Sequence, residues 1–185
     1  MNIAIWVILG IIAVLVIIAL TIFNSLIIAR NKVKNGWSQI DVQLKKRYDL
    51  VPNLVETVKG YAKHEAGTLS KITELRNQAM QSKDIKATMK TNDQMSKAIG
   101  GLLSVVVENY PDLKASQNFL MLQEELSGIE NKIAYARQYY NDIVMDYNNK
   151  IQTVPNNMFA NAFNFKEETF LEASQEEKKN VKVSF

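Results

Sequence analysis

The sequence predicts an all-α protein, in which one N-terminal transmembrane helix precedes an antiparallel bundle of three to four long helices, one of them kinked at Pro52. An uncharged apolar run extends from Ile3 to Phe23. Beyond it, apolar residues recur at helical spacing over most of the chain. The 185 residues include only seven glycines and three prolines, which favours long helices with few turns. We expect an anchor at 1–30, a helical bundle at 31–154, and a Phe-rich, partly disordered segment at 155–185.

The apolar run has the length of a membrane-spanning helix. At about 1.5 Å per residue it covers roughly 30 Å, the thickness of the hydrocarbon core of a bilayer. A secretory signal peptide would begin with basic residues, and Met1-Asn2 has none, so we favour an uncleaved anchor. A buried helix of a soluble core is the remaining alternative. The residues expected to contact lipid are Ile3, Trp6, Leu9, Leu15 and Phe23.

Basic residues follow the anchor directly, at Arg30, Lys32 and Lys34. Positive charge next to a membrane span usually stays on the cytoplasmic side. We therefore expect a single-pass protein of the cell membrane, with its N-terminus outside and its C-terminal domain in the cytoplasm. The same three side chains are expected to contact lipid headgroups. Asn35-Gly36 is expected to form a hinge, because both residues tolerate non-helical backbone.

A seven-residue repeat organises the segment after the anchor, as in helices that bury one face against partner helices. Its members are Trp37, Leu44, Val51 and Val58, with Ile40, Leu54 and Tyr61 three residues behind. Arg47 interrupts the second series, so the seam is partly polar. Pro52 removes a backbone donor, which predicts either a kink or a helix that ends and restarts, with Asp49 as the new cap.

Further helices are predicted downstream. The helical pattern continues to about Met80, and the polar stretch from Ser82 to Lys90 is expected to be a loop or a frayed turn. A capping box at Thr91 to Gln94 predicts the start of a helix that ends before Pro111. The longest helix, from Phe119 to Ile151, spans about ten turns. Because the preceding helix reaches only about half as far, we expect part of the apolar stripe to contact the kinked segment, the tail or another subunit.

The C-terminal segment after Pro155 is too apolar for a solvated tail, and we expect it to dock on the bundle or on a neighbour. Glu172 to Asn180 is expected to be disordered, and Val181 to Phe185 is ambiguous. Eight residues are the candidates for packing or interface contacts across the whole domain. They are Trp37, Leu44, Pro52, Leu126, Ile133, Tyr140, Phe159 and Phe163.

No catalytic, cofactor-binding or metal site is expected. The chain has no Cys, which excludes disulfides, thiolate metal sites and a Cys nucleophile. His64 is the only histidine, and Thr68 stands where a zinc-protease helix has its second one, so we interpret His64 as a surface or cap residue. Charged residues of the last helices are interpreted as a solvated face. They are Glu124, Glu125, Glu130, Asp142 and Asp146, with Lys97, Lys132 and Arg137.

Two long motifs resemble the signatures of the LemA family of bacterial proteins. They are NGWSQIDVQLKKRYDLVPNLVETVKGYAKHE and, later, YPDLKASQNFLMLQEELSGIENKIAYARQYYNDIVMDYN. With the N-terminal anchor and the Phe-rich end, the resemblance covers nearly the whole chain. It implies an N-terminal membrane segment and a helical soluble domain. It implies little chemistry, since most members have no established biochemical activity.

These observations favour a scaffold protein without catalytic activity, which acts by self-association and partner binding at the cytoplasmic face of a bacterial membrane. Its expected partners are membrane lipid, other copies of the chain and a membrane protein. Neither nucleic acid nor a small-molecule substrate is expected, because no reader helix, aromatic platform or phosphate loop accompanies the basic residues. The alternative is an adaptor or sensor for a membrane protease or envelope-stress system, supported by the association of relatives with membrane quality-control proteins. A membrane hydrolase with an unrecognised site is disfavoured by the lack of Cys and the single His.

Overall fold

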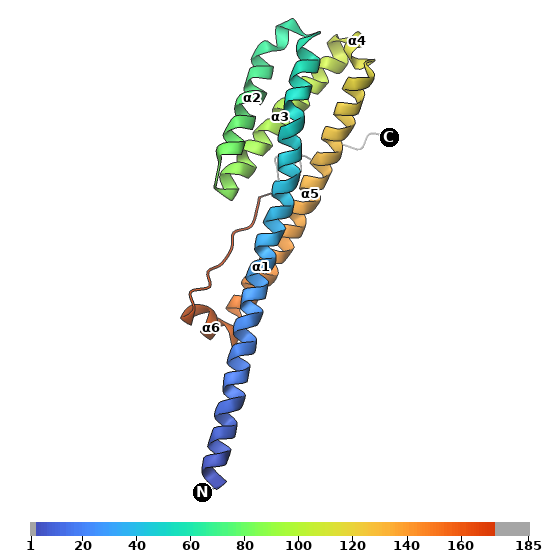
Figure 1. Cartoon of the computed structure of the whole chain (residues 1–185). Helices are drawn as coiled ribbons and strands as arrows, with labels where there is room; N and C mark the ends of the chain where they lie inside the picture. The colour runs from blue at the N-terminus through green and yellow to red at the C-terminus, as the bar shows by residue number, and fades with distance from the viewer. Residues whose placement is uncertain (1–2, 173–185) are drawn as a thin grey trace, which may run out of the picture. The chain divides into compact units, whose positions relative to one another are not determined.

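The computed structural model describes residues 3–172 and is helical over most of that range (Figure 1). Its helices are α1 (Ile3–Lys59), the 3-10 turn η1 (Lys63–Glu65), α2 (Ala66–Gln81), α3 (Ile85–Asn109), α4 (Pro111–Lys114), α5 (Gln117–Gln152) and α6 (Asn156–Ala162). Within residues 3–172 there is no strand, which confirms the all-α class. The predicted disorder up to Asn180 and the ambiguous end at 181–185 lie outside the described residues, apart from Glu172.

Helix α1 is continuous through both positions where a break was considered. The hinge predicted at Asn35-Gly36 is wrong, because Gly36 is helical and lets another helix approach closely. A Cβ on Gly36 would lie 3.2 Å from Cδ1 of Ile143 and 3.5 Å from Cδ2 of Tyr140. The alternative in which the helix ends and restarts at Pro52 is also wrong, since Pro52 lies inside α1. A kink at Pro52 stays a prediction.

Helix α3 begins earlier than the sequence predicted. The loop covers only residues 82–84, and α3 starts at Ile85. Asp84 caps this helix, since its carboxylate accepts a hydrogen bond of 2.7 Å from the backbone N–H of Ala87. The capping box at Thr91 is therefore wrong, and the adjacent Asn92 is fully buried in the helix. The predicted end before Pro111 is confirmed, with Pro111 in the first turn of α4.

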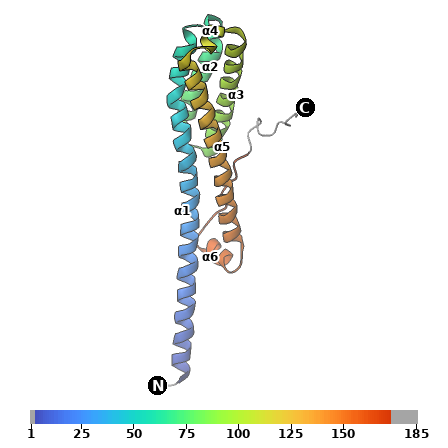
Figure 2. The same cartoon turned by 90° about the vertical axis from the view of Figure 1, so that its right-hand side faces the viewer.

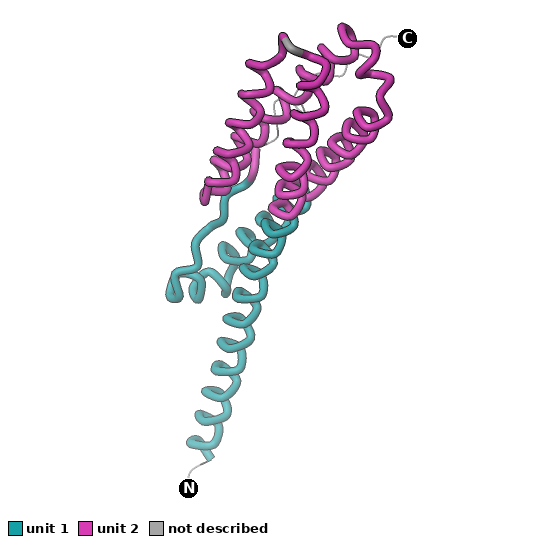
Figure 3. Tube along the Cα trace, turned by 45° about the horizontal axis from the view of Figure 1, so that its top comes forward, with its two compact units in different colours: residues 1–39, 138–170 teal, residues 40–137, 171–185 magenta. Residues whose placement is uncertain are grey.

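The chain divides into two compact units, which Figure 3 distinguishes by colour. Unit 1 contains residues 1–39 and 138–170, and unit 2 contains residues 40–137 and 171–185. Helices α1 and α5 each contribute residues to both units. We describe the two units separately.

Unit 2 contains residues 40–59 of α1, the helices α2, α3 and α4, and residues 117–137 of α5 (Figure 2). Helices α2 and α3 pack against each other. The Nε atom of Arg76 on α2 donates a 2.7 Å hydrogen bond to the backbone carbonyl of Tyr48 on α1. The interior is lined by apolar side chains that are at most 3% exposed, among them Leu44, Leu54, Ile72, Met95, Leu102, Leu113, Phe119, Leu126 and Ile133.

Unit 1 contains the first part of α1, the last part of α5 and α6. The ring of Trp37 on α1 meets the buried ring of Tyr140 on α5 edge-on, with centroids 6.5 Å apart. The segment after α6 is bonded along α5. The Tyr147 hydroxyl donates to the carbonyl of Lys166 at 2.9 Å, and the Asn148 side chain bonds both backbone groups of Glu168.

Candidate functional site

The first part of α1 presents a membrane-length apolar surface. None of the apolar stretch is buried in the described chain, so the interpretation as a core helix of a soluble protein is not supported. By length and composition α1 could cross a membrane, and it is the one helix between residues 3 and 172 that could. Of the residues expected to contact lipid, Ile3, Trp6, Leu9 and Leu15 are all more than half exposed, whereas Phe23 is half-buried.

The three cations after this stretch differ in their surroundings. Lys32 and Lys34 are exposed, whereas Arg30 is half-buried. The guanidinium of Arg30 lies 5.0 Å from the centroid of the Phe165 ring, a cation–π contact. Arg30 therefore has an intramolecular role as well as its predicted contact with headgroups.

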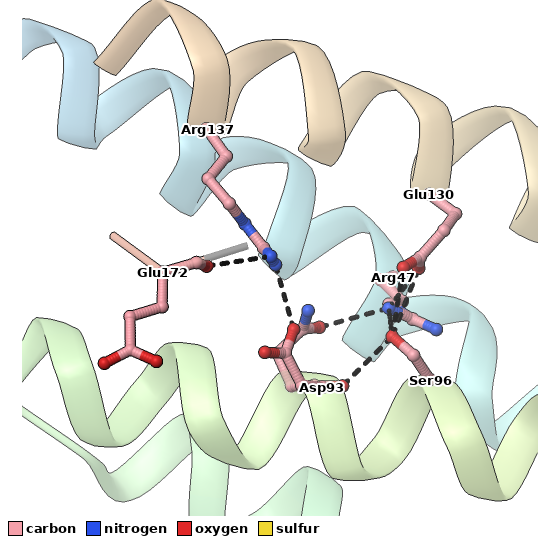
Figure 4. Close-up of polar contacts among 7 residues, drawn as sticks. Arg47, Asp93, Ser96, Glu130, Arg137 and Glu172 are labelled. Carbon is pink, nitrogen blue, oxygen red and sulfur yellow. Dashed lines mark hydrogen bonds and ion pairs between the residues drawn. The ribbon is translucent and has the colours of Figure 1, made fainter. Parts of the chain in front are cut away.

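A buried arginine connects three helices of unit 2 (Figure 4). Arg47 on α1 is 3% exposed and forms an ion pair with Glu130 on α5. Its Nη1 atom donates to Oγ of Ser96 at 2.8 Å and to Oδ1 of Asn92 at 3.2 Å, both on α3. Burial lowers the pKa of Arg47, although the neighbouring Glu130 carboxylate opposes this shift.

A second ion pair lies close to the first. Nη2 of Arg137 on α5 lies 2.9 Å from Oδ1 of Asp93 on α3. Nη1 of Arg137 also donates to the backbone carbonyl of Glu172 at 3.3 Å, which holds Glu172 against α5. Figure 4 shows both arginines reaching toward α3.

The interpretation of Glu130 and Arg137 as part of a solvated face is therefore wrong. Arg137 is 5% exposed, and Glu130 is the counter-ion of a buried cation. The sequence did indicate that Arg47 belongs to the buried face, because Arg47 takes a position of the apolar repeat. A signal was also available for Arg137, because it stands four residues after the buried Ile133, on the same helix face.

This polar cluster is suited to fixing positions rather than to chemistry. The guanidinium groups of Arg47 and Arg137 are hydrogen-bond donors only and have no atom that accepts a proton. The Ser96 hydroxyl lies 3.1 Å from Oε1 of Glu130, but that carboxylate is already engaged by Arg47. In residues 3–172 no three His, Cys, Asp or Glu side chains gather as metal ligands would. His64, in η1, is exposed, as its interpretation as a surface residue requires.

A groove of about 420 Å³ runs between α1 and α5 in unit 2. We call it the charged groove; it is lined by Lys46, Asp49 and Leu50 of α1 and by Glu125, Gly128, Ile129 and Lys132 of α5. Leu50 and Ile129 supply apolar surface, and nothing lies within 4 Å of a Cβ built on Gly128. The missing side chain of Gly128 therefore leaves the groove open.

The charges of this groove are separated by sign. In unit 2, α1 and α5 run in opposite directions (Figures 1 and 2). On α1, Lys46 precedes Asp49. On α5, Lys132 follows Glu125 by seven residues, which is about 10 Å along the helix axis. The two lysines therefore share one end of the groove, and the two acids share the other.

A second hollow, of about 640 Å³, lies between the end of α1 and the start of α2. It is lined mainly by small and apolar residues, namely Val55, Lys59, Ala62, Ala66, Leu69, Ser70 and Thr73. It shares no lining residue with the charged groove, so the two are separate surfaces.

Comparison with known proteins agrees with the two sequence motifs. The model of the LemA family matches residues 36–185, beginning at the glycine where α1 meets α5. The chain is 31% identical over 163 residues to protein LemA of Metamycoplasma hominis, a match that covers 87% of this chain and 74% of the relative. The family predicted from the sequence motifs is confirmed: this chain belongs to the LemA family.

Proposed function

We propose that the chain is a membrane-anchored scaffold, which acts by self-association and partner binding at the cytoplasmic face of a bacterial membrane. The observation that supports this most is the course of α1. One uninterrupted helix begins with an exposed apolar stretch and continues into the seam of buried residues such as Leu44 and Leu54. An anchor of this kind would hold the helical domain, which we infer to be an antiparallel bundle, at the membrane.

The orientation of the anchor follows from charge. Arg30, Lys32 and Lys34 stand directly after the apolar stretch, and basic residues at this position favour a cytoplasmic C-terminal domain. Replacing all three with Gln should give mixed orientation in a reporter-fusion assay, whereas the wild-type chain should give one. A single orientation in the variant would contradict the role of these charges.

Self-association is supported by the charged groove. When two copies meet about a two-fold axis perpendicular to the groove, their α1 helices run in opposite directions, as in copies anchored in two facing membranes, and each groove faces the inverted groove of the other copy. The end with Lys46 and Lys132 would then face the end with Asp49 and Glu125 of the other copy. The apolar surface of Leu50 and Ile129 would be covered in the same contact. Charge complementarity of this kind fixes the orientation of a contact more than its affinity.

Light scattering of the detergent-extracted full-length chain tests this proposal. We expect a discrete oligomer for the wild type and a smaller mass for the variant Lys46→Glu/Lys132→Glu. The reciprocal variant Asp49→Lys/Glu125→Lys should also dissociate, and mixing the two variants should restore the assembly. The matched control Lys86→Glu/Lys90→Glu changes two exposed lysines of α3 outside the groove and should leave the mass unchanged.

A monomeric wild type would contradict the scaffold and favour the alternative, an adaptor or sensor for a membrane protease or envelope-stress system. The observation in favour of that alternative is the second hollow, between α1 and α2. Its apolar lining, with Val55, Ala62 and Leu69, could accept apolar side chains of a partner protein. Bulky substitution at Ala66 should then abolish partner capture without changing the mass of the chain itself.

A further inference from the structure

The segment around α6 exposes large apolar side chains although it is packed in unit 1. Val154 is 78% exposed, Met158 is 70% exposed and Phe163 is 57% exposed. No charged residue occurs between Lys150 and Lys166, and the polar residues of this stretch are mainly asparagines. An uncharged segment that exposes Val, Met and Phe presents an apolar surface of the kind that a membrane or a protein contact covers, and a lysine stands at each end of it.

This segment is attached to α1 at a defined place. The ring of Phe163 packs against the ring of Phe23 with centroids 4.8 Å apart, and the Phe165 ring lies 6.1 Å from the same residue. Both views in Figures 1 and 2 show α6 beside α1. Phe23 is followed by Asn24 and Ser25 and then by four more apolar residues, and the first cation, Arg30, lies about 10 Å beyond Phe23 along the helix. Phe163 therefore contacts α1 near the end of its apolar stretch, about 10 Å before the first cation.

The place of the segment is fixed by contacts on both of its sides. On the side of α1, Arg30 stacks on Phe165, which is 8% exposed. On the side of α5, the hydroxyl of Tyr147 bonds the carbonyl of Lys166 at 2.9 Å, and Asn148 exchanges two hydrogen bonds with Glu168. The exposed side chains of Met158 and Phe163 are thus presented by a packed structure.

We infer that residues 154–165 form a second membrane contact, which lies at the boundary between headgroups and acyl chains beside the base of α1. Val154, Met158 and Phe163 would enter the acyl boundary, while the asparagine amides would remain among the headgroups. Lys150 and Lys166 would meet lipid phosphates. The inference rests on the proposed membrane anchor, because α1 defines the depth, and adds a lipid contact from a distant part of the chain.

Single-cysteine labelling of the full-length chain tests this inference, since the wild type has no Cys. Met158→Cys carries an environment-sensitive fluorophore in vesicles of phosphatidylcholine and phosphatidylglycerol. Leu15→Cys in the apolar run is the reference for the anchor, and Met80→Cys, at a 52% exposed position of α2, is the control. Some vesicles contain lipid with a nitroxide near the headgroup, and others contain lipid with a nitroxide at the end of the acyl chain.

We expect the Met158 label to lose roughly half of its emission with the shallow nitroxide and much less with the deep one. The Leu15 label should respond to the deep nitroxide, and the Met80 label to neither. If Leu15 responds and Met158 behaves like Met80, the inference is overturned while the anchor stands. If Leu15 also fails to respond, the anchor itself fails. A blue-shifted Met158 label that no lipid nitroxide quenches would mean that protein covers the segment, which also overturns the inference.

A second variant keeps the test independent of the label. With the fluorophore at Val154→Cys, the added substitution Met158→Asp should reduce shallow quenching, because a carboxylate is disfavoured at the acyl boundary. Met158 is 70% exposed, so its replacement leaves the packing of Phe23 on Phe163 unchanged. Met80→Asp is the matched control and should have no effect. Equal quenching with and without Met158→Asp would contradict the contact.

Discussion

Removing Glu130 tests how strongly the buried arginine depends on its counter-ion. Arg47 is 3% exposed, whereas the Glu130 side chain is 40% exposed. Breaking a buried ion pair from one side costs about 3–5 kcal/mol, because a charge stays buried without its partner. Since water reaches Glu130, we expect Glu130→Ala to lower the free energy of unfolding by a smaller amount, about 2–3 kcal/mol.

Arg47→Met removes the buried charge itself and should therefore cost less. The unbranched Met side chain fills similar space, and Glu130 can turn toward water. The buried Asn92 loses the donor at 3.2 Å, which costs about 1 kcal/mol. In the double variant Arg47→Met/Glu130→Ala, the second change should add almost nothing, so the pair should show a coupling energy of about 2–3 kcal/mol, the whole cost of Glu130→Ala alone.

Thermal unfolding of the full-length chain in detergent, followed by circular dichroism, measures these differences. For a chain of this length 1 kcal/mol corresponds to about 2–4 °C in Tm, so Glu130→Ala should lower Tm by roughly 4–12 °C. The control Glu124→Ala, at an exposed position of the same helix, should stay within about 1 °C. The reasoning is refuted if Glu130→Ala unfolds like the control, or if Arg47→Met is the more harmful change.

Three further substitutions have defined outcomes. Burial raises the pKa of Tyr48 to about 12, so the folded state keeps this proton longer than the unfolded state, and stability falls as pH rises from 10 toward 12. Tyr48→Phe should remove that loss. It should also add about 1 kcal/mol at neutral pH, because the buried hydroxyl has no hydrogen-bond partner within residues 3–172; an unchanged alkaline melting profile would contradict this. Gly36→Ala should raise Tm by a few degrees, because replacing Gly by Ala inside a helix gains about 1 kcal/mol and the tip of the flexible Ile143 side chain can move away. The control is Gly100→Ala, which has open space around it. A lower Tm for Gly36→Ala alone would show that α1 and α5 cannot accommodate a methyl group at this position. Leu126→Asp should unfold the domain, since Leu126 is 3% exposed within one chain, and a folded monomer by circular dichroism and light scattering would refute this.

The helices could be predicted because apolar periodicity directly reports which face is buried. The error at the start of α3 has a physical cause. Asn92 resembles a cap because Asn favours caps, but here its amide is buried as a partner of Arg47. The true cap, Asp84, precedes a turn with too few apolar residues to reveal a helix. In α1, a long helix remained continuous through Gly36 and Pro52, where local propensity alone favours a break.

The polar cluster could be predicted only in part. Arg47 was visible as an interruption of the apolar seam, but its partners on α3 and α5 are distant in the sequence and have no pattern of their own. Glu130 and Arg137 look like ordinary charged residues of a long helix. Their contacts depend on which helix lies opposite, and that information comes from the tertiary structure.

The position of Arg47 explains how a repetitive seam can specify one alignment of its helices. A seven-residue repeat permits α1 to slide along α5 by one repeat, about 10 Å, while apolar residues still meet apolar residues. In the observed alignment Arg47 meets Glu130. A slide in one direction would place Arg47 opposite Gln123, and a slide in the other would place it opposite Arg137, a like charge.

Both slides leave a buried guanidinium without its carboxylate, so the polar cluster penalises the misalignments that the apolar residues tolerate. Arg47→Met should therefore keep most of the stability while losing this selectivity. Spin labels at Lys46→Cys and Lys132→Cys, which line the same end of the charged groove, would measure it. If the distance between the two labels has one value in the chain with Arg47 and two or more values in Arg47→Met, the ion pair sets the alignment of α1 and α5. If it has one value in both chains, the apolar side chains alone set the alignment.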